Sequence, residues 1–128
     1  MVGLVIVSHS PKVAEGAVDL AQEMAHGYDQ LVAAGGLDDG TIGTDAVRIK
    51  EAIERADDGD GVVVLCDVGS SIMSTETAMD LLESDITVRI ADAPIIEGVI
   101  AAAVSASIGQ DIAAVVADAE DAKSFSKL

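Results

Sequence analysis

Apolar residues follow two patterns along the chain: short continuous runs, and longer segments in which they recur every three or four positions. The continuous runs cover residues 3–7, 30–36, 62–67 and 86–90, and such runs are typical of strands covered on both faces. The periodic segments predict helices over residues 11–27, 44–56, 69–82, 95–108 and 112–119. Because strand and helix alternate four times, the sequence predicts a three-layer α/β fold. Its open sheet is mostly parallel and carries helices on both faces.

The helix starts and the inward faces follow from particular residues. Ser10 is a good N-cap, Pro11 suits the first helical position, and Thr44 can cap the second helix. The residues predicted to face inward are Val13, Ala17, Leu20, Ala21 and Met24 in the first helix, Ala46, Ile49, Ile53 and Ala56 in the second, and Ile72, Met79 and Leu82 in the third.

The length and composition indicate one compact domain. The chain has 128 residues, of which 50% are hydrophobic and 2% aromatic, so the core must consist of aliphatic residues and alanine. We expect this domain to cover residues 1–122 and residues 123–128 to form a disordered tail. The single cysteine, Cys66, lies in an apolar run and allows no disulfide within the chain.

The charge of the chain limits its partners. The net charge is −16, from 23 acidic and 7 basic residues, and such a surface repels nucleic acids and anionic membranes. The acidic surface serves either ordinary solubility or a high-salt cytoplasm in which salt screens the repulsion. No signal peptide and no membrane-spanning run is present, so a cytoplasmic location is expected.

The scarce histidines differ in their positions. His9 follows the first predicted strand and directly precedes the N-cap of a helix, where unpaired N–H groups favour a phosphate dianion and disfavour an imidazolium. Asp67 ends the third strand at the same edge of the sheet, and its carboxylate can fix the imidazole tautomer if the two strands are neighbours. Asp67 can also cap the next helix. His26 ends a helix, which explains it without a function.

Two further loops reach the same edge of the sheet. They offer glycine-freed backbone and hydroxyl groups as phosphate-binding positions: Gly36, Thr44, Gly69, Ser70 and Ser71. The histidines, cysteine and acidic residues lack the spacing of metal ligands, so neither a metal nor another cofactor is expected.

Four segments carry a resemblance to a known family: "LVIVSHS", "AAGGLDDGTIGTDAVRIKEAIE", "DVGSSIMSTETAMDLL" and "APIIEGVIAAAVSAS". They closely resemble the mannose-type enzyme IIA domain of the phosphotransferase system. Within that group they resemble the phosphotransfer (M) subunit of phosphoenolpyruvate-dependent dihydroxyacetone kinase. The resemblance implies strand order 2-1-3-4, which makes the strands before His9 and Asp67 neighbours, and a homodimer.

The resemblance also implies a function. His9 would accept a phosphoryl group from the phosphocarrier protein HPr, with Asp67 orienting its ring. It would pass the group to ADP on the L subunit of the kinase, and the ATP formed would serve dihydroxyacetone bound to the K subunit. The five loop positions are carried over as phosphate-binding. The alternative is a IIA component of sugar uptake that hands the phosphoryl group to a IIB component.

Two other classes of protein fit the residues less well. A receiver domain places its phosphorylated aspartate where Asp67 lies, but it needs an acidic pair after the first strand, where this chain has Ser8, His9 and Ser10. A histidine phosphatase or mutase needs an arginine beside the histidine to bind phosphate, and none is near in the sequence. A non-catalytic binding protein is disfavoured because three loops converge on His9.

Overall fold

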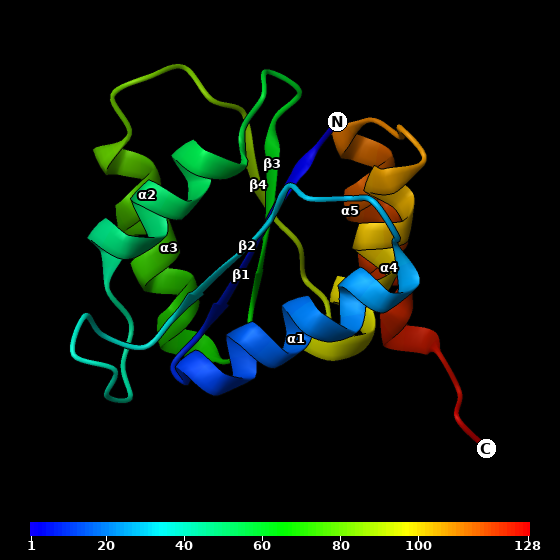
Figure 1. Ribbon diagram of the computed structural model, residues 1–128, viewed down its shortest axis with the longest axis horizontal. Helices are drawn as coiled ribbons and strands as arrows, with labels where there is room; N and C mark the ends of the chain where they lie inside the picture. The colour runs from blue at the N-terminus through cyan, green and yellow to red at the C-terminus, as the bar shows by residue number, and fades with distance from the viewer.

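The computed structural model describes residues 1–128, which form a parallel sheet between two layers of helices (Figure 1). In chain order the elements are β1 (Gly3–Ser8), α1 (Pro11–Met24), β2 (Leu31–Gly35), α2 (Ala46–Ala56), β3 (Val62–Cys66), α3 (Gly69–Leu81), β4 (Val88–Ile90), α4 (Ile95–Ser107), α5 (Ile112–Asp121) and a 3₁₀ turn (Ala122–Ser124). The strand order is β2-β1-β3-β4 and every pair is parallel. The predicted fold class and strand order are therefore confirmed.

The central strand β1 determines where the chemistry lies. It pairs with β2 on one side and with β3 on the other, and Val7 stands opposite Cys66 in the second pair. Because the strands are parallel, the residues that follow β1 and β3 emerge at the same edge of the sheet. This carboxyl edge receives His9 and Asp67.

Each face of the sheet has its own apolar core. On one face Leu4 and Ile6 of β1 pack with α1, α4 and α5, and on the other Val5 and Val7 pack with α2 and α3. Figure 1 shows these two helix layers on opposite sides of the strands. The alternation along β1 explains why its sequence is continuously apolar, since both faces are covered.

The predicted inward face of α1 is only partly right. Ala17 and Ala21 are buried as expected, together with Ala14, whereas the larger Val13, Leu20 and Met24 are 43%, 50% and 61% exposed. A stripe of alanines lets the helix axis approach the sheet and α4 closely, so the bulkier side chains turn outward.

The start of α2 and the face of α3 also differ from the prediction. The N-cap of α2 is Asp45, whose carboxylate accepts from the N–H groups of Val47 and Arg48, and not Thr44. In α3 the buried face consists of Ser71, Thr75 and Ala78, while Ile72 is 41% exposed. Helix α3 therefore also packs through small residues.

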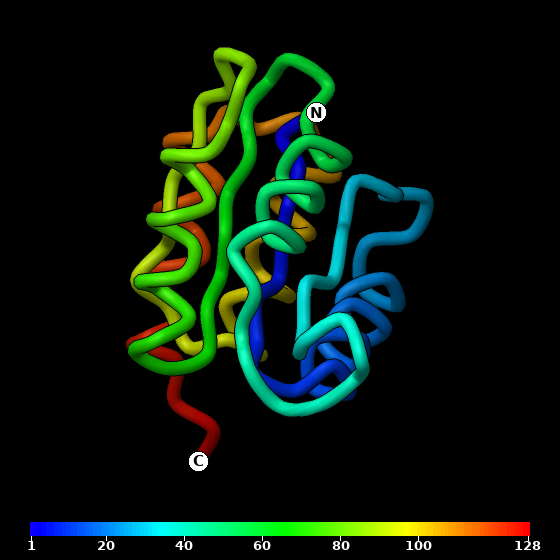
Figure 2. Tube along the Cα trace, turned by 90° about the vertical axis from the view of Figure 1, so that its left-hand side faces the viewer, coloured from blue at the N-terminus to red at the C-terminus, as the bar shows by residue number.

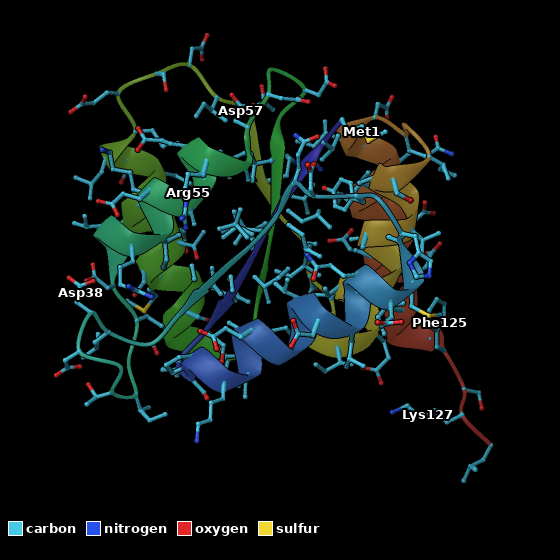
Figure 3. All side chains as sticks on the ribbon, viewed as in Figure 1. Met1, Asp38, Arg55, Asp57, Phe125 and Lys127 are labelled. Atoms are coloured by element: carbon cyan, nitrogen blue, oxygen red, sulfur yellow. The ribbon has the colours of Figure 1, made fainter.

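The ends of the chain lie at different places. The N-terminal ammonium of Met1 contacts Asp58 at 2.8 Å and Asp60 at 2.7 Å, at the amino edge of the sheet, where Figure 3 labels Met1 and Asp57. The last four residues, 125–128, have no secondary structure and extend from the body (Figure 2), with Lys127 2.8 Å from Glu97. None of the helices combines the length and the apolar character needed to cross a membrane.

Candidate active site

The backbone at the carboxyl edge holds the histidine and the aspartate against each other. His9 follows the last residue of β1, and the N–H of Asp67 donates to the carbonyl of Val7 at 3.1 Å, which continues the β1–β3 pairing by one residue. The Asp67 carboxylate then turns back toward the His9 ring. Its Oδ1 lies 3.1 Å and its Oδ2 3.3 Å from Nδ1. The predicted contact between the two side chains is present, because β1 and β3 are neighbours.

Four hydrogen-bonding groups surround the Asp67 carboxylate. Oδ2 accepts from the Ser8 hydroxyl at 2.9 Å and from the His9 N–H at 3.0 Å, and Oδ1 accepts from the Val68 N–H at 2.8 Å. The Nδ1 of His9 completes the set. A carboxylate has about four lone-pair sites, so this one is fully used.

These contacts decide the charge of Asp67. Partial burial raises the pKa of its carboxyl group, but the N–H groups of His9 and Val68 and the Ser8 hydroxyl outweigh that effect and lower the pKa to about 2. Asp67 is therefore ionised at neutral pH and can only accept hydrogen bonds. It follows that Nδ1 of His9 carries a proton and donates it to Asp67.

The other ring nitrogen of His9 faces the start of α3. Nε2 lies 2.5 Å from the Ser70 hydroxyl, and the His9 side chain keeps 25% of its surface exposed. Helix α3 begins at Gly69 without a side-chain cap, so the N–H groups of Gly69 and Ser70 are available at this edge, whereas the Ser71 N–H donates to the Val68 carbonyl at 2.9 Å. A Cβ atom at Gly69 would meet nothing within 4 Å, which shows that the space beside the helix start is open.

The glycine-rich loop after β2 supports the site from the other side. The Gly36 N–H donates to the Ser8 carbonyl at 3.1 Å, and the Gly43 N–H donates to the His9 carbonyl at 2.9 Å. Gly36 has φ +68°, and a Cβ atom there would lie 2.5 Å from a side-chain carbon of Pro11, so only glycine fits. The loop thus fixes the backbone carbonyls of Ser8 and His9, directly before and after the His9 Cα atom.

The five predicted loop positions divide into two groups. Ser70 directly contacts the His9 ring and Gly69 lies at the open helix start beside Asp67. The structure does not bring the others to the ring as free phosphate ligands. The Gly36 N–H already donates to the Ser8 carbonyl, and the Thr44 hydroxyl is hydrogen-bonded to the Ser74 hydroxyl at 2.6 Å. Ser71 is buried, and its hydroxyl donates to the Val68 carbonyl.

Ser8 is the contact that the sequence analysis missed. It is 1% exposed and its hydroxyl reaches Asp67, whereas the sequence marks it only as the residue before His9. The available signal was a serine at the end of an otherwise apolar strand, since a buried hydroxyl needs a hydrogen-bond partner.

No three His, Cys, Asp or Glu side chains gather into a group that could hold a metal ion.

Comparison with known sequences decides the family. The family described as "PTS system fructose IIA component" matches residues 3–116. The chain belongs to this family of phosphotransferase-system IIA components. The match contains both His9 and Asp67, and it confirms the resemblance seen in the sequence.

The relatives of this IIA chain are phosphoryl donor subunits. The chain is 48% identical over 124 residues to the phosphoryl donor subunit DhaM of the phosphoenolpyruvate-dependent dihydroxyacetone kinase of Escherichia coli, with 93% of this chain covered. It spans only 26% of that protein's length. A DhaM subunit of Listeria innocua is 36% identical, and the match covers 84% of this chain and 88% of that subunit.

A solved structure agrees with the fold. The EIIA component of Streptococcus agalactiae superposes with a TM-score of 0.69 at 16% identity, covering 95% of this chain and 92% of the other. At this identity the likeness concerns the fold alone.

Proposed function

We propose that this chain is a phosphohistidine relay of a phosphoenolpyruvate-dependent dihydroxyacetone kinase. His9 accepts a phosphoryl group from phospho-HPr and transfers it to ADP on the kinase's L subunit, and the ATP formed serves dihydroxyacetone on the K subunit. The single observation that carries this proposal is the His9–Asp67 contact, 3.1 Å from Nδ1 to Oδ1, in a chain of the IIA family.

The geometry supports a separate task for each ring nitrogen. Nδ1 is protonated and bonded to the ionised Asp67, so the lone pair of the neutral ring is on Nε2, which faces the open start of α3. Nε2 is therefore the nucleophile. The Ser70 hydroxyl, which donates to Nε2 in this state, must turn aside for the attack, and it can then donate to a phosphoryl oxygen.

The bonds, electron pairs and protons of the transfer balance without another co-reactant. The Nε2 lone pair forms the new N–P bond as the P–N bond of the donor's phosphohistidine breaks, and the donor ring keeps that electron pair. The His9 ring keeps its Nδ1 proton and gains positive charge, which the Asp67 carboxylate offsets at hydrogen-bond distance. Transfer to ADP reverses these changes at His9, and the imidazole returns to its neutral form.

The phosphoryl oxygens would be met by backbone dipoles rather than by cations. Gly69 and Ser70 at the start of α3 supply unpaired N–H groups, and no lysine or arginine contacts the His9 ring or Asp67. Modest stabilisation suits a relay, because a phosphoryl group that is bound too tightly would not leave.

Partners must bind briefly and near this edge. Val68, directly before α3, and Met73 in α3 are 63% and 69% exposed, so apolar surface is available beside the site for transient docking. We further propose a cytoplasmic setting and a homodimer for this chain, together with HPr and the L and K subunits as its partners.

Labelling of His9 tests the proposal. Incubation with phosphoenolpyruvate, enzyme I and HPr should give acid-labile, base-stable phosphate on His9, and His9→Ala should abolish it. His26→Ala is the matched control, because His26 is the only other histidine and lies exposed after α1, so it should label like the wild type. Label on an aspartate, or no label, would refute the relay.

A second assay separates the kinase from sugar uptake. When the K and L subunits, ADP and dihydroxyacetone are added to the labelled chain, the phosphate should leave His9 and appear on dihydroxyacetone. Retention of the label with these subunits, and its loss to a IIB component, would favour the sugar-uptake alternative.

A further inference from the structure

Ser8 lies where the buried end of β1 meets the site. It is 1% exposed and is one of four polar side chains in the buried core of the molecule. Its backbone carbonyl accepts from the Gly36 N–H, and its hydroxyl contacts both Asp67 and Ser10. A buried hydroxyl with two partners is held in one orientation.

The partners of Ser8 determine the direction of its proton. The Ser10 N–H lies 3.0 Å from the Ser8 Oγ, and because a backbone N–H can only donate, Oγ must accept this bond. The Ser8 O–H then points to the Asp67 Oδ2, 2.9 Å away. Each lone-pair position of the Asp67 carboxylate is thereby matched to a donor, and the carboxylate cannot rotate without breaking several bonds at once.

We propose that Ser8 is a positioning residue for phosphoryl transfer. Its hydroxyl holds the Asp67 carboxylate at the angle that keeps the His9 proton on Nδ1 and leaves Nε2 unprotonated. This inference rests on the proposed relay function. Without the Ser8 hydroxyl, Oδ2 loses its shortest contact and keeps the His9 N–H at 3.0 Å and the longer contact to Nδ1 at 3.3 Å, so the carboxylate can turn away from the ring. The ring then also adopts the tautomer with the proton on Nε2, in which Nε2 has no free lone pair to attack phosphorus and Nδ1 faces Asp67.

The chain provides a matched control two residues away. Ser10 flanks His9 on the other side, but its hydroxyl accepts from the Val13 N–H as the N-cap of α1, and it has no side-chain contact with Asp67. Ser8→Ala and Ser10→Ala make the same chemical change on the two sides of His9. The first removes a donor from the carboxylate and the second removes a helix cap.

Two measurements test the proposal. Long-range proton–nitrogen NMR reports the tautomer of the His9 ring, with His26 as an internal reference. The rate of His9 phosphorylation by phosphoramidate, a small donor that needs no docking surface, reports its nucleophilicity. We expect Nδ1–H in the wild type, mixed tautomers and a rate at least about tenfold lower in Ser8→Ala, and wild-type values for both in Ser10→Ala.

The outcomes separate this inference from the relay itself. A wild-type tautomer and rate in Ser8→Ala would overturn the role of Ser8. Failure of the wild type to accept phosphate from phospho-HPr would overturn the relay, while the NMR tautomers would still decide whether Ser8 positions the ring. Ser8→Cys, which keeps a weaker donor of similar size, should fall between Ser8→Ala and the wild type in both measurements, and it replaces Ser8→Ala if that variant does not fold.

Discussion

The Asp67 carboxylate joins the stability of the fold to the chemistry of the site. It accepts from two backbone N–H groups, one hydroxyl and the His9 ring, and these donors come from both sides of the β1–β3 pair. Hydrogen bonds to a charged group contribute a net stabilisation of about 1.5–3 kcal/mol. The same bonds that orient His9 should therefore help to hold β3 beside β1.

The stability contributed by Asp67 should depend on pH. The pKa of its carboxyl group is lowered from 3.8 to about 2 in the folded chain, so the contribution is present above the unfolded value and is lost as the pH falls through the folded value. Asp67→Asn should lower the free energy of unfolding by about 1–3 kcal/mol near neutral pH. Urea unfolding of both proteins should show this gap shrinking below about pH 4.

An exposed aspartate provides the control for this prediction. Asp80→Asn on the outer side of α3 removes the same charge without a hydrogen bond to the site and should shift the unfolding midpoint little at any pH. An Asp67→Asn gap of equal size near neutral pH and in acid would contradict the assigned contacts.

At the residue level the sequence predicted the pair but not its surroundings. His9 and Asp67 were predicted from strand ends, because parallel strands deliver their carboxyl ends to one edge. The inward turn of the Ser71 hydroxyl and the outward turn of Ser70 could not be predicted. They depend on which face of α3 packs against the sheet, because neighbouring side chains on a helix point about 100° apart, and the small residues Ser71, Thr75 and Ala78 face inward instead of Ile72.

Two helices, α1 and α3, pack through small residues. Alanines form the buried stripe of α1, and Ser71, Thr75 and Ala78 form that of α3. The Thr75 hydroxyl donates to the Ser71 carbonyl at 2.8 Å, one turn back, and so needs no partner in the core. Close approach of helix and sheet replaces bulk as the source of packing.

Two helical glycines should respond oppositely to alanine. Gly16 lies in α1, where a Cβ atom would meet nothing within 4 Å, so Gly16→Ala should stabilise the chain by about 0.5–1 kcal/mol through helix propensity. Gly98 lies in α4, where a Cβ atom would come within 2.9 Å of Ala93 and 3.1 Å of Leu65. Gly98→Ala should therefore destabilise the chain by about 1–3 kcal/mol despite the same propensity gain.

Thermal or urea unfolding of these two single variants measures the difference. Each serves as the control for the other, because the substitution and the type of element are the same. Equal shifts in the same direction would contradict the close approach of α4 to the sheet.

At the element level the sequence correctly predicted which helices and strands exist and their order. It predicted less well which face of each helix points inward. All five helices and four strands are present, and the α2 stripe of Ile49, Ile53 and Ala56 is buried as predicted. The prediction for α1 was wrong where it assumed that the largest apolar residues point inward. The pattern of positions cannot reveal how closely a helix approaches its sheet, and that distance decides whether alanine or leucine fills the gap.

The whole molecule carries far more negative than positive charge. The net charge of −16 on 128 residues causes the acidic side chains to repel one another, and folding brings these charges closer together. The few ion pairs, such as Arg48–Asp38 at 3.3 Å and Lys123–Asp92 at 3.2 Å, lie at the surface and offset little of this repulsion.

Salt should therefore stabilise this chain. Raising KCl from about 0.1 M to about 1 M shortens the screening length from about 10 Å to about 3 Å, so the urea midpoint should rise. NaCl at equal ionic strength is the control, since screening does not distinguish the two cations. A flat or falling midpoint would show that repulsion between the acidic side chains does not limit stability.

The chain segment 57–61 between α2 and β3 separates the two halves of the site. Everything before it supplies Ser8 and His9, and everything after it supplies Asp67 and Ser70. Residues 58–60 are exposed, so the backbone can be cut there with little loss of packing. The first fragment would carry His9 without Asp67 and Ser70, so transfer from phospho-HPr should return only when the fragments reassociate. Phosphorylation of His9 by HPr would then report split-protein complementation.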